Sequence, residues 1–129
     1  MSECKGRILV VEDNADEAQM VKMILEPRGY EVALAADGQQ GLDKVHSEKP
    51  DLVILDVMMP VLDGFSMCRK LREDPQYADI KVILLTAVGA HIRDTNYPLD
   101  GVLRAEAQEY LEKPIDPEAL LATVERWVA

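Results

Sequence analysis

Short apolar runs alternate along this chain with longer segments in which apolar residues recur at helical spacing. The short runs are rich in aliphatic residues and predict five strands, at 7–11, 30–35, 51–56, 80–85 and around 109–111. Strands that alternate with helices in this way are joined by right-handed crossovers into a parallel sheet covered on both faces. The pattern therefore predicts a doubly wound α/β domain built on five parallel strands.

Capping residues mark where the predicted helices begin. Asn14 is the expected N-cap of the first helix, and Glu17 follows three residues later, as in a capping box. Asp37 and Asp63 are the expected caps of the second and third helices, the second ending near residue 46. The Asp116-Pro117 pair predicts the start of the last helix, because proline in the first turn loses no hydrogen bond.

The segment 88–107 has no such regular pattern. It contains Asn96, Pro98 and Gly101, which interrupt a helix. We therefore expect a long loop here, followed by a short helix from about Leu99 to Ala107.

Composition limits the domain count and the kinds of partner. The 129 residues, 48% of them hydrophobic, can bury one core, so we expect a single domain over 1–129. A formal charge of -10 argues against direct binding of nucleic acid or an anionic membrane, which both need clustered positive charge. The absence of a signal-peptide pattern and of an apolar run near ~20 residues favours a cytoplasmic protein with no membrane contact.

Reactive side chains follow the predicted strands at one end. Glu12 and Asp13 come after the first strand, Asp56 ends the third, Thr86 follows the fourth, and Lys113 follows the fifth. Because the carboxyl ends of parallel strands meet at one edge, where such sheets bind ligands, these side chains should converge. Each has a structural explanation when taken alone, such as a helix-dipole role for the first two acids. Together they predict a binding site.

Three carboxylates at one site repel one another unless a cation lies between them. Hard oxygen ligands suit Mg²⁺, and Mg²⁺ with Lys113 would balance three negative charges with three positive ones. A phosphoryl group can then be held by the metal, the lysine ammonium and the Thr86 hydroxyl while an Asp56 oxygen attacks phosphorus in line. The pattern indicates that Asp56 is a nucleophile.

The chain resembles the receiver domain of two-component response regulators, in particular the single-domain type similar to chemotaxis regulators. The resemblance runs from ILVVEDN through DLVILDVMMPVLDG and ILLTA to EYLEKP. It implies a flavodoxin-like (βα)5 fold with strand order 2-1-3-4-5. It also implies a histidine kinase or phosphotransfer protein as phosphoryl donor, a downstream protein target, and either a monomer or a phosphorylation-dependent dimer.

The resemblance assigns metal and phosphoryl roles to four of these positions. Asp56 matches the phosphoacceptor, and Asp13 matches the acid that binds Mg²⁺ directly. Glu12 matches an acid that acts mainly through metal-bound water, and Met58 matches the residue whose backbone carbonyl binds the metal.

The remaining matches concern the response to phosphorylation. Thr86 matches the switch hydroxyl, Lys113 the lysine that pairs with the phosphoryl group, and Tyr110 the switch aromatic. Pro114 is expected to be a cis proline. The site would thus relay phosphorylation of Asp56 to a partner through Thr86 and Tyr110.

Some positions depart from the family pattern. The spacing between Thr86 and Lys113 is a few residues longer than usual, and the residues before Tyr110 are EAQE rather than a glycine, an alanine and an acidic pair. Met58 and Val88 stand where the family commonly has polar side chains that align a hydrolytic water. Neither makes a strong hydrogen bond, which predicts slow self-dephosphorylation.

Two other functional classes fit these residues poorly. A phosphatase of the haloacid dehalogenase type needs a second acid two residues after its nucleophile, where this chain has Met58. A flavodoxin needs a phosphate loop rich in hydroxyls and glycine, whereas EDNADE would repel a phosphate without a cation. We expect a signalling domain rather than an enzyme. A stand-alone regulator is favoured by the initial Met and the absence of a terminal linker, and the alternative is a receiver from a hybrid histidine kinase or from a regulator with an output domain.

Overall fold

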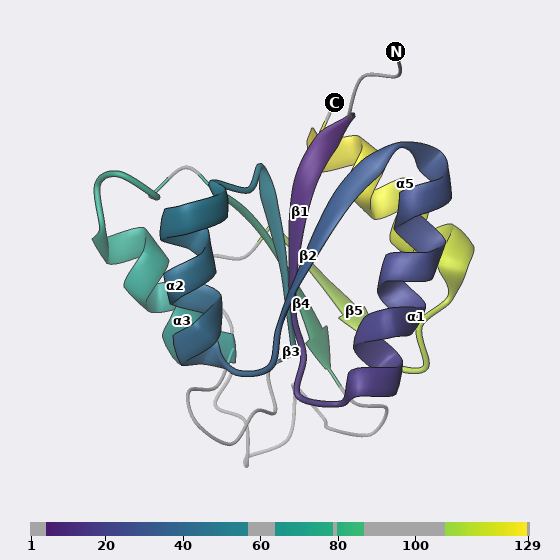
Figure 1. The fold of residues 1–129 in the computed structure, drawn as a ribbon, viewed down its shortest axis with the longest axis horizontal. Helices are drawn as coiled ribbons and strands as arrows, with labels where there is room; N and C mark the ends of the chain where they lie inside the picture. Colours follow the sequence, from purple (N-terminus) through teal and green to yellow (C-terminus); the bar gives the residue numbers. More distant parts are fainter. Residues whose placement is uncertain (1–4, 57–63, 79, 87–107, 129) are drawn as a thin grey trace.

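The computed structural model describes residues 5–56, 64–78, 80–86 and 108–128, in which a parallel sheet lies between two layers of helices (Figure 1). The elements in chain order are β1 (Gly6–Val11), α1 (Ala15–Leu25), the 3₁₀ turn η1 (Glu26–Arg28), β2 (Tyr30–Ala35), α2 (Gly38–Glu48), β3 (Leu52–Asp56), α3 (Gly64–Glu73), β4 (Lys81–Thr86), β5 (Glu109–Glu112) and α5 (Pro117–Val128). The strand order is β2-β1-β3-β4-β5, and all neighbouring strands are parallel. The predicted doubly wound fold and its strand order 2-1-3-4-5 are confirmed.

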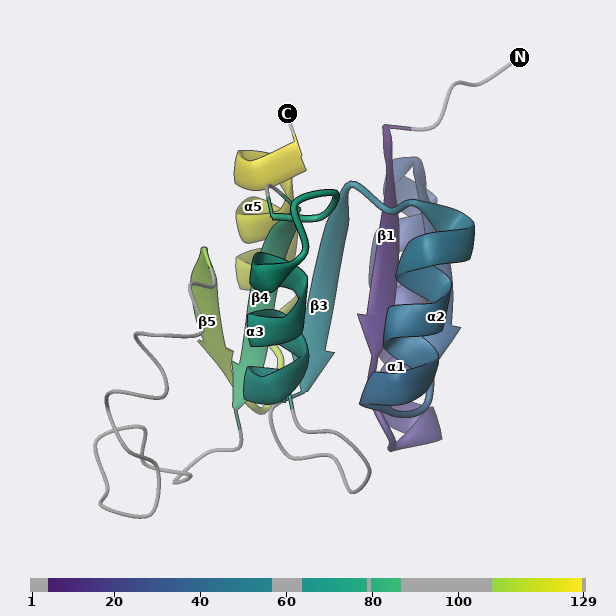
Figure 2. The ribbon, with the colours of Figure 1, turned by 90° about the vertical axis from the view of Figure 1, so that its left-hand side faces the viewer.

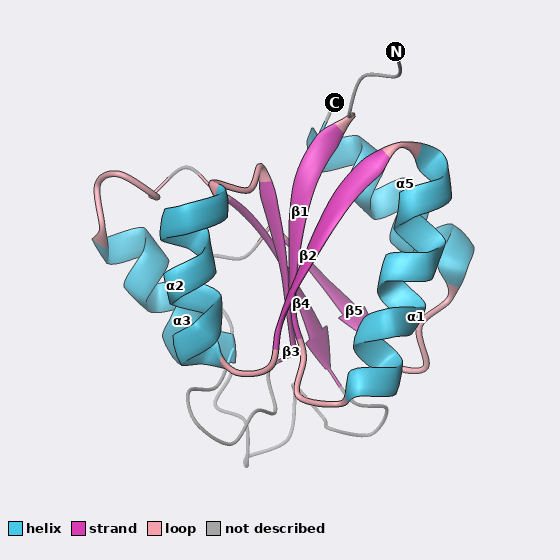
Figure 3. Ribbon diagram, viewed as in Figure 1, coloured by secondary structure: helices cyan, strands magenta, loops and turns pink. Residues whose placement is uncertain are grey.

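The central strands carry continuous apolar runs between their ends because both faces of the sheet are covered. Along β1, Ile8 and Val10 pack with α1 and α5, whereas Leu9 and Val11 pack with α2 and α3. Figure 3 shows the two helical layers on opposite sides of the strands. A strand buried on both faces has no polar alternation, which explains the continuous apolar runs in the sequence.

The helix caps follow the sequence signals in most respects. The Asn14 side chain accepts a hydrogen bond from the Glu17 N–H, and the Asp37 side chain accepts one from the Gln40 N–H. The second half of the expected capping box differs, because the Asn14 N–H donates to a Glu12 carboxylate oxygen and the Glu17 carboxylate turns elsewhere. The helix α2 also continues to Glu48, two residues past its predicted end.

Several predictions fall on segments outside the described residues. They are Asp63 as the cap of α3, the loop and short helix between residues 88 and 107, and the roles of Met58 and Val88. Among the residues that the structure describes, no helix is long and apolar enough to cross a membrane.

A side-chain amide extends the sheet at the start of β5. The Gln108 N–H donates to the Val82 carbonyl, and the Gln108 Oε1 accepts from the Val82 N–H at 2.7 Å. The same Oε1 accepts from the Arg72 guanidinium at 3.0 Å, and Arg72 also donates to the Ala78 and Ile80 carbonyls. The departure from the family pattern at Gln108 thus supplies a strand-like contact between α3, β4 and β5.

Candidate functional site

The strand register places the predicted site residues at one level of the sheet. Val11 of β1 lies opposite Leu55 of β3, so Glu12 and Asp56 follow side by side at the carboxyl ends of these strands. Thr86 ends β4 opposite Glu112, the last residue of β5, and Lys113 comes next. The strand arrows in Figure 2 point the same way, so these ends share one edge. The prediction that they converge is therefore confirmed at the level of the backbone.

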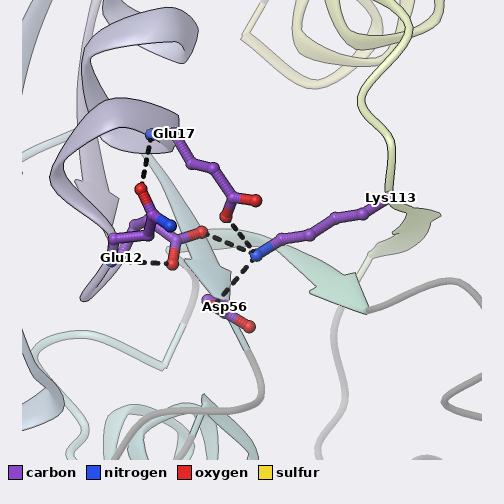
Figure 4. Close-up of polar contacts among 5 residues, drawn as sticks. Glu12, Glu17, Asp56 and Lys113 are labelled. Carbon is purple, nitrogen blue, oxygen red and sulfur yellow. Dashed lines mark hydrogen bonds and ion pairs between the residues drawn. The ribbon is translucent and has the colours of Figure 1, made fainter.

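Lys113 is the centre of the polar contacts at this edge. Its Nζ lies 2.9 Å from Glu12 Oε1, 2.6 Å from Glu17 Oε2 and 3.1 Å from Asp56 Oδ2. Figure 4 shows the lysine reaching from the end of β5 toward carboxylates carried by β3, the loop after β1, and α1. Since an ammonium has three N–H donors, these three carboxylates can occupy all of them.

Three acids form a compact group suited to a cation. Glu12, Asp13 and Asp56 each offer a carboxylate oxygen, and these oxygens all lie within 4.8 Å of one another. Glu12 and Asp56 are buried, with 3% of each residue exposed, whereas Asp13 is exposed. Oxygen donors at this separation match the ligands that Mg²⁺ takes in proteins. The donor set therefore fits the metal that was predicted from the sequence.

Burial and mutual repulsion shape the protonation of the cluster. The pKa of Glu12 is raised from 4.5 to about 8, because burial disfavours its charge and the neighbouring Asp56 adds to the effect. Hydrogen bonds from Lys113 and from the Asn14 N–H act in the opposite direction. Burial lowers the pKa of Lys113, but its hydrogen bonds to Glu17, Glu12 and Asp56 outweigh burial and raise the pKa above its usual value. Lys113 is therefore charged at neutral pH.

The other predicted residues are placed less completely. Tyr110 lies on β5 opposite Leu84, where its ring is partly buried against the core beneath α2 and α3. The Lys113-Pro114 peptide bond is cis, as expected. For Thr86 the structure describes the backbone, which forms the last residue of β4. Met58 lies outside the described residues.

Glu17 is the site residue that the sequence reasoning missed. The sequence pattern indicates only a capping-box role for Glu17, yet its carboxylate makes the shortest of the three contacts to Lys113. Two features of the sequence point toward this arrangement: Glu17 is in the first turn of α1, and α1 begins directly after the acidic loop of the site. A first-turn side chain of such a helix can face the edge of the sheet.

Comparison with known proteins decides the family. A family model for the response regulator receiver domain matches residues 8–125. The chain belongs to this family. Receiver domains are signalling domains of two-component systems that bind Mg²⁺ in an acidic pocket, and Glu12, Asp13 and Asp56 form an acidic cluster in this chain.

The curated relatives are longer than this receiver domain. The DNA-binding dual master transcriptional regulator RpaA of Synechocystis is 42% identical over 118 residues, which cover 92% of this chain and 47% of RpaA. The chain spans about half the length of the first curated relatives that it matches. The DNA binding in the name of RpaA belongs to that whole protein.

Two solved structures show receiver domains in different contexts. The chemotaxis protein CheY4 of Vibrio cholerae is 33% identical with a TM-score of 0.81, and the match covers 94% of this chain and 97% of that one. The receiver domain of the sensor histidine kinase PA1611 from Pseudomonas aeruginosa is 31% identical with a TM-score of 0.83, covering 95% and 97%. That domain holds a magnesium ion in its active-site cleft.

Proposed function

We propose that this receiver domain is a phosphorylation-dependent switch in which Asp56 accepts a phosphoryl group from the phosphohistidine of a histidine kinase or phosphotransfer protein. The observation that carries the proposal is the buried Asp56 carboxylate, which lies 3.1 Å from the Lys113 ammonium and close to the acids Glu12 and Asp13. Burial and neighbouring acids both disfavour a charged carboxylate, so Asp56 is better explained by a chemical role than by a contribution to stability.

The metal in this proposal is Mg²⁺, held by Asp13 and Asp56, with Glu12 acting mainly through water and the Met58 backbone carbonyl as a further ligand. When bound, Mg²⁺ supplies positive charge that offsets the carboxylates and the phosphoryl oxygens. The support for this assignment is the separation of the three carboxylate oxygens, within 4.8 Å of one another, together with their hard-donor chemistry.

Asp56 is the nucleophile in the proposed transfer. One of its oxygens forms a bond to phosphorus as the bond from phosphorus to the donor imidazole nitrogen breaks, and that nitrogen leaves with the electron pair. Lys113 pairs with a phosphoryl oxygen and compensates its charge, since its ammonium already lies beside Asp56. The Thr86 hydroxyl binds a second phosphoryl oxygen.

The proposed output runs from Thr86 to Tyr110 and on to a protein partner. Thr86 ends β4, and Tyr110 lies on β5, the neighbouring strand, so a shift of one strand end is transmitted directly to the other. The partner is a protein rather than nucleic acid or membrane, in keeping with the formal charge of -10. In this proposal residues 1–129 form one receiver domain that acts in the cytoplasm. A receiver within a longer protein is a context favoured by relatives about twice the length of the chain.

Phosphorylation of purified protein tests the proposal. With acetyl phosphate and Mg²⁺, intact-mass analysis should show one added phosphate on the wild type and none on Asp56→Asn. Asp51→Asn is the matched control, since Asp51 lies at the opposite end of β3, and asparagine retains an acceptor for the Arg7 N–H. This control should be phosphorylated normally. Equal phosphorylation of Asp56→Asn and the wild type would contradict the assignment.

A further inference from the structure

We infer that Glu17 is a positioning residue that holds Lys113 before phosphorylation and competes with the incoming phosphoryl group for it. The inference rests on the proposed function of Asp56 and adds a residue to it. The starting observation is the salt bridge of 2.6 Å between Glu17 and Lys113. It links the first turn of α1 to the residue that follows β5.

Lys113 has to release a partner before it can bind a phosphoryl oxygen. Its three N–H donors are matched by carboxylate oxygens of Glu12, Glu17 and Asp56 at 2.6–3.1 Å. A new phosphoryl oxygen therefore replaces one of these contacts rather than adding a fourth. The order of release follows from how firmly each carboxylate is held.

Glu17 is the partner that can leave at the lowest cost. The side chain of Glu12 is 1% exposed and that of Asp56 is 5% exposed, so water is not at hand to replace the lysine for either carboxylate. Glu12 is also fixed through its second oxygen by the Asn14 N–H. The Glu17 side chain is 35% exposed, so its carboxylate can exchange the lysine for water.

The negative charge of Glu17 is a second reason to expect that this residue opposes phosphorylation. The balance of three acids against Mg²⁺ and Lys113 does not include Glu17, whose carboxylate adds a negative charge beside Lys113. That charge repels an anionic phosphoryl group that approaches the same Lys113 ammonium. Glu17 thus opposes phosphorylation both by occupying Lys113 and by its charge.

The test compares Glu17→Gln with Asp16→Asn. Glutamine is isosteric with glutamate but neutral, so it weakens the hold on Lys113. Asp16 is an exposed acid in the same first turn, so its replacement removes an equal charge and the same helix-dipole contribution. The probes are beryllofluoride, which mimics a bound phosphoryl group, and acetyl phosphate, both with Mg²⁺. Glu17→Gln should tighten beryllofluoride binding and speed phosphorylation by about threefold to tenfold, and Asp16→Asn by less than about twofold.

A measurement on metal-free protein tests the contact between Glu17 and Lys113 in the absence of phosphorylation. The NMR signals of the Lys113 Cε and Nζ groups should shift in Glu17→Gln and stay unchanged in Asp16→Asn. Wild-type beryllofluoride affinity in Glu17→Gln, or equal increases in both variants, would overturn the role of Glu17 while leaving Asp56 as the acceptor. A wild-type protein that takes up no phosphate at Asp56 would overturn both proposals.

Discussion

Replacing Lys113 by methionine should destabilise the metal-free protein and tighten Mg²⁺ binding. The lysine is the shared partner of Glu12, Glu17 and Asp56, and its side chain is only 16% exposed. Removal of one partner from a buried ion pair commonly costs about 3–5 kcal/mol. The cost here should be lower, about 2–3 kcal/mol, because Glu12, whose pKa is about 8, is already mostly protonated at pH 7 and leaves little uncompensated charge.

Mg²⁺ should reverse this loss of stability. Without the lysine ammonium, the three acids of the cluster attract the cation more strongly, and we expect an affinity about tenfold higher than that of the wild type. At a concentration 100 times its dissociation constant, a ligand that binds only the folded state adds about 2.7 kcal/mol. Saturating Mg²⁺ should therefore bring Lys113→Met close to the stability of the metal-free wild type.

Urea unfolding in EDTA and in excess MgCl₂, followed by circular dichroism, measures both effects, and calorimetric titration gives the affinity. Lys22→Met is the control, since Lys22 and Glu26 form a partly exposed pair at 4.0 Å that should contribute less than about 0.5 kcal/mol. If Lys113→Met were as stable as the wild type in EDTA, or bound Mg²⁺ more weakly, the assignment of Lys113 as the internal counter-charge would be refuted.

Three further predictions concern pH, the sheet edge and phosphoryl lifetime. The folded-state pKa of Glu12, about 8, exceeds its usual 4.5, so metal-free stability should fall as pH rises between these values. Glu12→Gln should flatten that slope in urea titrations from pH 5 to 8.5, and an unchanged slope would disprove the cause. Gln108→Ala should cost about 1–2 kcal/mol in unfolding free energy, because it removes the acceptor for the Val82 N–H and for Arg72; a cost below about 0.3 kcal/mol would contradict this. Met58→Asn with Val88→Glu should shorten the lifetime of the aspartyl phosphate, measured by loss of label after donor removal. Identical decay would show that the apolar side chains at 58 and 88 do not set this lifetime.

The fold could be predicted almost completely from the sequence because it depends on local and repetitive signals. Runs such as 52–55 are buried on both faces, so their apolar character marks the strands to within about one residue. The convergence of Glu12, Asp56 and Lys113 followed from the rule that parallel strands share their carboxyl ends.

The remaining contacts join side chains that are far apart in the sequence, and they depend on where each side chain points in the folded domain. Glu17 and Lys113 are 96 positions apart, and Arg72 and Gln108 are 36 apart. Local patterns classify Glu17 as a capping residue and Gln108 as a departure from the family, and neither pattern indicates which side chain lies opposite. These pairings become visible only when the helices are placed against the sheet.

Chemical mapping of the phosphorylated residue tests the central claim most directly. Borohydride reduces an aspartyl phosphate to homoserine, so treatment of phosphorylated protein followed by peptide mass spectrometry identifies the acceptor. The account predicts homoserine at position 56 after incubation with acetyl phosphate and Mg²⁺, and none when EDTA replaces the metal. Phosphorylated protein with homoserine at Asp13, Asp51 or any position other than 56 would contradict the account.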